Sequence, residues 1–136
     1  MSIDFIRLII DFGLVVLIWT VQLVIYPSFL YYQREDLLIW HRKYTSQISL
    51  IVIPLMLAQL GLSIVQVTLT SSFLAISSLV LVLLIWILTF WQFVPIHNSI
   101  SGSIVDTKML NTLVKKNWIR TVLWTAIFLM SIFFQK

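Results

Sequence analysis

The chain has 136 residues, of which 60% are hydrophobic and 10% charged, with a mean hydropathy of +1.03. A soluble domain typically carries about 25% charged residues, so this composition excludes an ordinary water-soluble protein. The lack of cysteine excludes disulfides, thiolate catalysis and sulfur-ligated metals. The net charge of +4 comes from Lys and Arg beside apolar segments, which indicates a membrane and no nucleic-acid partner.

Four apolar segments predict transmembrane helices, because about 20 apolar residues cross a hydrocarbon core of about 30 Å. They cover about 8–31, 46–69, 73–94 and 113–134. The first is expected to stay as a helix, since it is too long for a signal peptide and no small-residue cleavage site follows it. Only short loops remain, so we expect one domain, 1–136, folded as an all-α four-transmembrane-helix bundle.

The loops predict the orientation of this bundle. Seven cations lie in or beside the first and third loops: Arg34, Arg42, Lys43, Lys108, Lys115, Lys116 and Arg120. The opposite side carries only Arg7 and Lys136. The positive-inside rule therefore predicts a multi-pass protein of the bacterial cytoplasmic (inner) membrane, with both termini on the non-cytoplasmic side.

The first segment opens with Asp4, Arg7 and Asp11, which are three and four residues apart and share a helix face. We expect a self-neutralising cluster at the outer interface, with a proton or cation site at Asp11 as the alternative. Pro27 then ends or kinks the helix, because proline lacks the amide hydrogen and crowds the preceding turn.

The later segments contain further helix signals. Met56, Gln59, Ser63 and Gln66 form an inward stripe, whose polar members are typical of contacts between membrane helices. Pro95 is expected to stop the third helix. Asp106 is a predicted N-cap for a long last helix, because its carboxylate can accept from exposed amides.

Most of the remaining polar residues fall at the cytoplasmic end, and every helix contributes to them. They are Trp19, Gln22, Tyr26, His41, Tyr44, Gln92, His97, Asn98, Asn117, Arg120 and Trp124. Mixed pockets of this kind between helices are common ligand sites. If chemistry occurs there, His97 is the natural general base, and Arg120 or Asn117 would stabilise an oxyanion.

Arg120 is the most informative member, because a charge inside the membrane needs a partner and no carboxylate lies near it within the spans. Snorkelling to lipid phosphate, pairing with a loop carboxylate, and contact with an anionic or carbonyl-bearing ligand all remain open. Two histidines, His41 and His97, would suffice for a haem, but both lie near the interface without further ligands, which disfavours haem. No metal site and no particular cofactor is predicted.

The residues of this constellation also carry a resemblance. The patterns are Trp19-x-x-Gln22-x-x-x-Tyr26-Pro27, His41-x-x-Tyr44, Trp86-x-x-Thr89-x-x-Gln92-x-x-Pro95-x-His97-Asn98 and Asn117-Trp118-Ile119-Arg120-Thr121-x-x-Trp124. Together they resemble a family of small four-helix bacterial membrane proteins of unassigned function. The proline and asparagine after the third helix and the Asn-x-x-Arg of the fourth are similar to the anthrone-oxygenase-like superfamily. This resemblance implies a four-helix bundle, with His97, Asn98, Asn117 and Arg120 as site residues. Some members of that superfamily oxidise polycyclic phenols without an obvious metal.

Three function classes follow. The first is a protein that binds a lipid-soluble, aromatic or quinone-like molecule in the cytoplasmic pocket, with a cofactor-independent oxygenase or oxidoreductase activity. The second is a small, oligomeric transporter or channel, which requires polar residues to continue to the outer face through Gln59, Gln66 and Asp11. The third is a structural or accessory subunit. The concentration of polar residues at one end favours the first, with membrane lipids and a small ligand as partners.

Overall fold

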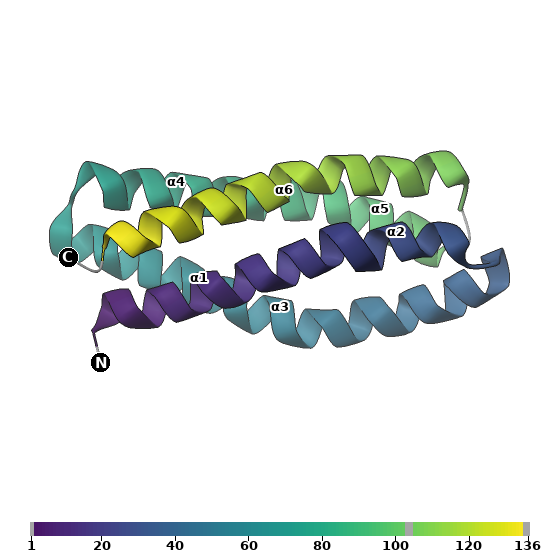
Figure 1. Cartoon of the computed structure of the whole chain (residues 1–136), viewed down its shortest axis with the longest axis horizontal. Helices are drawn as coiled ribbons and strands as arrows, with labels where there is room; N and C mark the ends of the chain where they lie inside the picture. The colour runs from purple at the N-terminus through teal and green to yellow at the C-terminus, as the bar shows by residue number, and fades with distance from the viewer. Residues whose placement is uncertain (1, 103–104, 135–136) are drawn as a thin grey trace.

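A computed structural model describes residues 2–102 and 105–134 of the chain, and Lys136 lies outside these ranges. The described residues form four helical rods: Ile3–Tyr31, Arg34–Thr70, Phe73–Ser101 and Thr107–Phe133. The rods lie side by side as an antiparallel bundle (Figure 1), in which the first and third rods each pack against the second and fourth. The predicted all-α four-helix fold is therefore confirmed.

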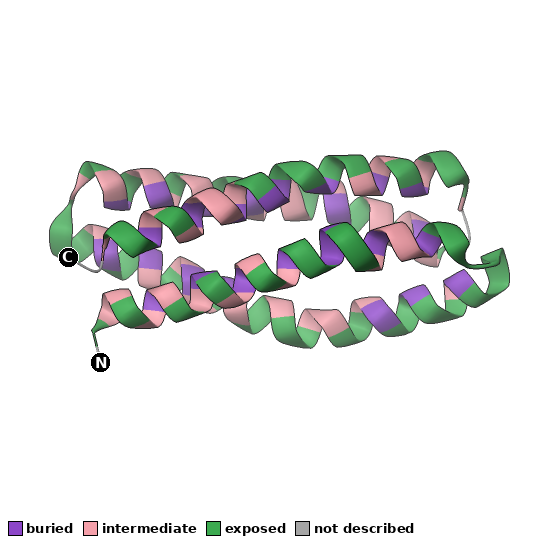
Figure 2. Cartoon of the chain, in the orientation of Figure 1, coloured by how far each residue is buried: buried purple, intermediate pink, exposed green. Residues whose placement is uncertain are grey.

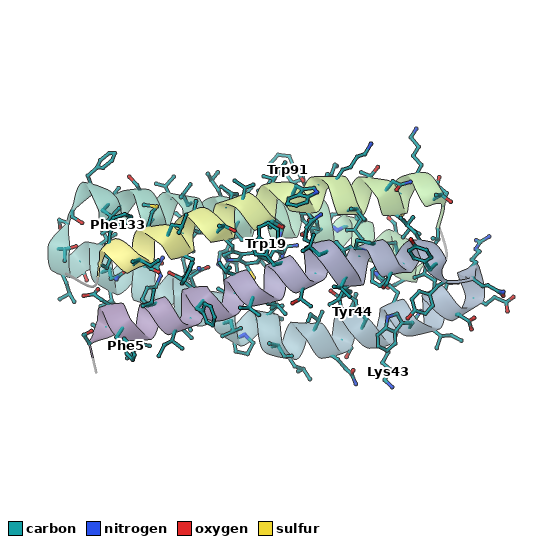
Figure 3. The ribbon with its side chains drawn as sticks, viewed as in Figure 1. Phe5, Trp19, Lys43, Tyr44, Trp91 and Phe133 are labelled. Atoms are coloured by element: carbon teal, nitrogen blue, oxygen red, sulfur yellow. The ribbon has the colours of Figure 1, made fainter. Side chains whose placement is uncertain are left out.

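The elements within these rods follow one another closely. In chain order they are α1 (Ile3–Thr20), η1 (Val21–Ile25), α2 (Tyr26–Ser28), η2 (Phe29–Tyr31), α3 (Arg34–Thr70), α4 (Phe73–Leu88), η3 (Thr89–Phe93), α5 (Val94–Ser101) and α6 (Thr107–Phe133). The predicted N-cap is confirmed, because Asp106 Oδ1 accepts from the Met109 amide at 2.6 Å. Phe5 and Phe133 lie at the same end of the bundle (Figure 3), which we call the terminal end; the other is the loop end.

The bundle is apolar on its outside. Large apolar side chains such as Leu50 and Trp91 are 74% and 78% exposed, and exposed positions run along every rod (Figure 2). Such a surface suits lipid and not water. Three rods, Ile3–Tyr31, Arg34–Thr70 and Phe73–Ser101, are long and apolar enough to cross a membrane. α6 is not among them, because cations lie along its first half at Lys108, Lys115, Lys116 and Arg120.

Two prolines lie directly after π-helical turns. η1 ends at Ile25 and η3 ends at Phe93, so in both cases one residue separates the π turn from the proline. A π turn holds one more residue than an α turn, so it can accommodate the missing amide and the bulk of a proline ring without ending the helix. The prediction that Pro95 stops the third helix is therefore wrong, since α5 continues to Ser101. π turns inside helices are frequent at functional sites.

Candidate functional site

A cavity of about 510 Å³ lies inside the loop-end half of the bundle. Ile18, Val21 and Tyr26 line it from the first rod, and Arg120 and Trp124 line it from α6. The segment 44–57 of α3 forms one side wall, and the segment 86–98, from α4 through η3 into α5, forms the other. Most of these side chains are apolar, so the cavity suits a ligand that is itself largely apolar.

The cavity opens sideways, between α3 and the third rod. Ile53 and Leu57 of α3 and Phe90 of η3 line it, yet each is more than half exposed on the outer surface of the bundle. The mouth therefore lies on the apolar surface that suits lipid. A molecule dissolved in the bilayer would reach the cavity without passing through water.

Arg120 supplies the charge at the inner wall of the cavity. Its side chain is 7% exposed, and Cζ lies 4.3 Å from the ring centroid of Phe93 and 5.0 Å from that of Trp124. The guanidinium also lies beside the Tyr26 hydroxyl. Cation–π contacts stabilise a guanidinium but leave its N–H donors directed elsewhere. No carboxylate among the described residues pairs with it.

Three buried donors around the cavity lack a hydrogen-bond partner among the described residues: Trp86 Nε1, Thr89 Oγ1 and Arg120 Nε. A buried polar group without a partner costs about 1–3 kcal/mol, so three at one cavity call for an explanation. Gln92 Oε1 and Asn117 Oδ1 also lack partners, but neither residue lines this cavity. All three cavity groups can donate, so an acceptor oxygen on a ligand would satisfy them.

Two histidines meet at the edge of the cavity. His97 Nε2 lies 2.9 Å from the Tyr26 hydroxyl, and His97 Nδ1 lies 2.8 Å from His41 Nε2. His41 Nδ1 in turn lies 3.0 Å from Ser101 Oγ. Because the two imidazoles bond each other directly, no space for a porphyrin exists between them, and this pair does not fit haem. No cluster of three metal-ligating side chains occurs in the described part of the chain.

The terminal end contains a second buried polar cluster, which we call the Arg7 cluster. Arg7 and Asp11 are fully buried and form a 2.8 Å ion pair. Arg7 also donates to Gln66 Oε1 and Ser78 Oγ, each at 2.8 Å, and Gln59 Nε2 donates to Asp11 Oδ1 at 2.6 Å. The expected self-neutralising pair exists, and it is buried between the helices. The expectation that polar residues concentrate at one end is wrong.

A single side chain joins the two regions. Trp124, which lines the cavity, donates through Nε1 to Gln59 Oε1 at 3.1 Å, and Gln59 belongs to the Arg7 cluster. The inward stripe predicted on α3 is confirmed, since its members Met56, Gln59, Ser63 and Gln66 are all buried.

The structure brings six of the predicted site residues to the cavity: Tyr26, Tyr44, His97, Asn98, Arg120 and Trp124. Three others are buried away from the cavity lining: Gln22, His41 and Asn117. His41 bonds His97, and Asn117 Nδ2 donates to Gln22 Oε1 at 2.9 Å. Asn117 thus contacts Gln22, whereas Arg120 faces the cavity. The last two lie elsewhere: Trp19 Nε1 donates to Thr125, and Gln92 lines a separate hollow beside Lys116.

The geometry of the helices explains these differences. Trp86, Thr89 and Gln92 are three residues apart, which is less than the 3.6 residues of an α turn and further below a π turn such as η3, so two steps rotate Gln92 out of line. Trp86, Phe93 and His97 follow the full period and line the cavity. Trp86 and Thr89 were not predicted as ligand contacts. The spacing of Trp86 and Thr89 relative to His97 is the sequence feature that could have predicted them as cavity residues.

Comparison of this chain with protein-family models, with curated proteins and with solved structures finds no match.

Proposed function

We propose that this membrane protein binds a lipid-soluble aromatic molecule carrying a carbonyl or phenolic oxygen, such as a quinone-like compound, in the cavity beside Arg120. The observation that carries this proposal is the set of three unpartnered donors, Trp86 Nε1, Thr89 Oγ1 and Arg120 Nε, on an otherwise apolar wall. Aromatic rings would pack against Phe93 and Trp124, while the oxygen would accept from the donors. The lateral mouth explains how such a molecule enters.

When the bound molecule is a phenol or an enol, the chemistry that this site supports is abstraction of its O–H proton. His97 lines the cavity and can accept a proton, and Arg120 would stabilise the anion that remains. An electron-rich phenolate or enolate is the form in which such molecules react with oxidants. We therefore propose a cofactor-independent oxygenase or oxidoreductase, a class also implied by the resemblance to the anthrone-oxygenase-like superfamily.

We further propose that α6 is a fourth transmembrane helix and that the loop end faces the cytoplasm in a bacterial inner membrane. α6 packs against the first and third rods, both of which are apolar enough to span a bilayer. Arg120, which lowers the apolar character of α6, is covered by Phe93 and Trp124 and not by lipid. The cations at Arg34, Arg42, Lys43, Lys108, Lys115 and Lys116 support the cytoplasmic assignment.

A titration with menadione, a lipid-soluble naphthoquinone, tests the binding proposal. The protein is held in lipid nanodiscs, and quenching of tryptophan fluorescence reports binding, since Trp86 and Trp124 line the cavity. We expect saturable quenching that Arg120→Met weakens. Lys115→Met is the matched control, because it removes an exposed cation from the same helix. Equal binding by the wild type and Arg120→Met would contradict the proposal.

A small transporter of protons is a second candidate, and the Trp124–Gln59 hydrogen bond favours it. This bond connects the cavity to the Arg7 cluster, and from there Gln66 Nε2 donates to Asp4 Oδ1 at 2.7 Å. Buried polar groups thus follow one another toward the terminal end. Proton flux into liposomes containing the protein, abolished by Gln59→Leu, would support transport. Absence of flux with menadione binding intact would favour the ligand-binding function.

A further inference from the structure

Four side chains form a continuous chain of hydrogen bonds from the cavity to the loop end. The sequence of contacts runs from the Tyr26 hydroxyl to His97, from His97 to His41, and from His41 to Ser101, at 2.9, 2.8 and 3.0 Å. Each of the two imidazoles forms hydrogen bonds through both of its ring nitrogens. This arrangement allows a proton to enter a ring on one side and leave on the other.

This series of hydrogen bonds begins at a buried side chain and ends near the surface of the bundle. Tyr26 is 3% exposed and His41 is fully buried, whereas Ser101 is only half-buried at the end of α5. The exposed side chain of Arg42 holds this end in place, because Nε and Nη2 both donate to the Ser101 carbonyl, at 3.2 and 2.9 Å. The buried end lines the cavity, where the Tyr26 hydroxyl lies beside Arg120.

Aromatic rings surround the middle of the chain. The Phe29 ring contacts the rings of His41 and Tyr44, with centroids 5.5 Å apart in both cases. The two imidazoles stack with centroids 5.0 Å apart. Among the described side chains, each imidazole forms hydrogen bonds only to its neighbours in this series of four residues.

We propose that Tyr26, His97, His41 and Ser101 are a proton relay between the ligand in the cavity and the loop-end surface, and that the ligand is a phenol or enol bound as its oxyanion. This proposal rests on the ligand-binding function proposed above. It adds the class of ligand, an acidic O–H compound, and assigns to His41 and Ser101 a role in moving the proton away.

The transfer balances at each group. The ligand O–H gives its proton to Tyr26 Oη, the Tyr26 proton moves to His97 Nε2, and His97 Nδ1 releases its proton to His41 Nε2. His41 Nδ1 then gives its proton to Ser101 Oγ, whose own proton leaves to water. Every protein group gains one proton and loses one. The ligand oxyanion remains beside Arg120, whose charge compensates it.

2-Naphthol is a suitable probe, because it is a lipid-soluble phenol that becomes a strong acid only in its excited state. Bound naphthol then emits as naphtholate only when an acceptor removes the proton within its excited-state lifetime. The full-length protein in nanodiscs is excited at wavelengths where tryptophan does not absorb. Affinity is measured separately from the anisotropy of the probe, with empty nanodiscs as background.

We expect naphtholate emission from the wild type and its loss in His97→Phe. In His41→Gln the proton can reach His97 but cannot continue, because an amide does not exchange protons as an imidazole does. It therefore returns to the probe, and we expect naphtholate emission to fall by about 100-fold, the lower end of what one positioned proton-transfer group contributes, with unchanged affinity. Ser101→Ala should reduce the emission less, because water can replace the hydroxyl.

Ser99→Ala is the matched control for Ser101→Ala. Ser99 lies on the same helix, but its hydroxyl donates to the Pro95 carbonyl and takes no part in the chain. Undiminished naphtholate emission in His41→Gln would overturn the relay and leave the binding proposal standing. Failure of 2-naphthol to bind the wild type, together with failure of menadione, would overturn the binding proposal and the relay with it.

Discussion

Two arginines lie buried in this bundle, and their surroundings differ. Arg7 makes hydrogen bonds to Asp11, Gln66 and Ser78, so its charge is paired and each of its three nitrogens has a partner. Arg120 rests on Phe93 and Trp124, and its Nε has no partner among the described residues. A buried charge with a complete set of partners contributes to the structure of the bundle. A buried charge with unmet donors on a cavity indicates a binding site.

The comparison also separates the two clusters by chemistry. The Arg7 cluster contains a carboxylate, so it is electrically balanced without a ligand. The cavity is lined by the Arg120 guanidinium and the His97 imidazole but by no carboxylate. A ligand oxyanion in the cavity would neutralise the charge of Arg120, as Asp11 neutralises the charge of Arg7 at the terminal end.

Removing Asp11 should produce the largest loss of stability. Asp11→Ala leaves the Arg7 charge buried without its partner, which costs about 3–5 kcal/mol. Unfolding in mixed micelles, followed by circular dichroism, measures this. The double variant Arg7→Met with Asp11→Leu should recover most of the loss, because replacing a buried ion pair by apolar groups is often neutral. A mild Asp11→Ala phenotype would mean that the Arg7 cluster is not structural.

Gln59→Leu tests the connection between the two regions. The change leaves Trp124 Nε1 and Asp11 Oδ1 without the Gln59 side chain as partner. We expect a loss of about 2–6 kcal/mol in the free energy of unfolding, since each of the two unmet buried groups costs about 1–3 kcal/mol. Menadione binding should also weaken, because Trp124 lines the cavity. Ser63→Ala, which removes a hydroxyl bonded to its own helix, is the control.

Arg120→Met should leave the stability of the protein largely unchanged, in contrast to Asp11→Ala. Loss of the cation–π contacts, about 0.5–2 kcal/mol, is offset by removal of an unpartnered buried group, so stability should change little. Affinity for menadione should fall by about 10- to 100-fold, because hydrogen bonds to a charged group contribute about 1.5–3 kcal/mol. A large loss of stability with unchanged affinity would make Arg120 another structural arginine.

Trp86→Phe is the smallest expected change. It keeps an aromatic ring but removes the unpartnered N–H from the cavity wall. Stability should be unchanged or slightly higher, and affinity for menadione should fall by about 3- to 10-fold, the effect of one neutral hydrogen bond of about 0.5–1.5 kcal/mol. Trp91→Phe, on the exposed surface, should change neither quantity.

The fold was predictable from the sequence because apolar segments of membrane length leave little freedom. The site was predictable in part: Tyr26, His97 and Arg120 were identified because costly polar residues in apolar segments tend to have a role. Asn117 and Gln92 were placed at the site as polar residues at the same end of the bundle, and the actual rotation of each helix directs them elsewhere. The sequence predicted the pairing of Arg7 with Asp11 on the same helix face. Its other partners, Gln66 and Ser78, could not be predicted, because they are distant in sequence and only the packing of three helices brings them together.

The most direct test of the central claim, that the Arg120 cavity holds a lipid-soluble aromatic ligand, is to identify what co-purifies with the protein. Wild type, Arg120→Met and Lys115→Met would be isolated from native membranes in mild detergent and examined by UV–visible spectroscopy and mass spectrometry. We predict an oxygen-bearing aromatic compound with the wild type and Lys115→Met, and its loss from Arg120→Met. The same phospholipid alone in all three samples would contradict the account.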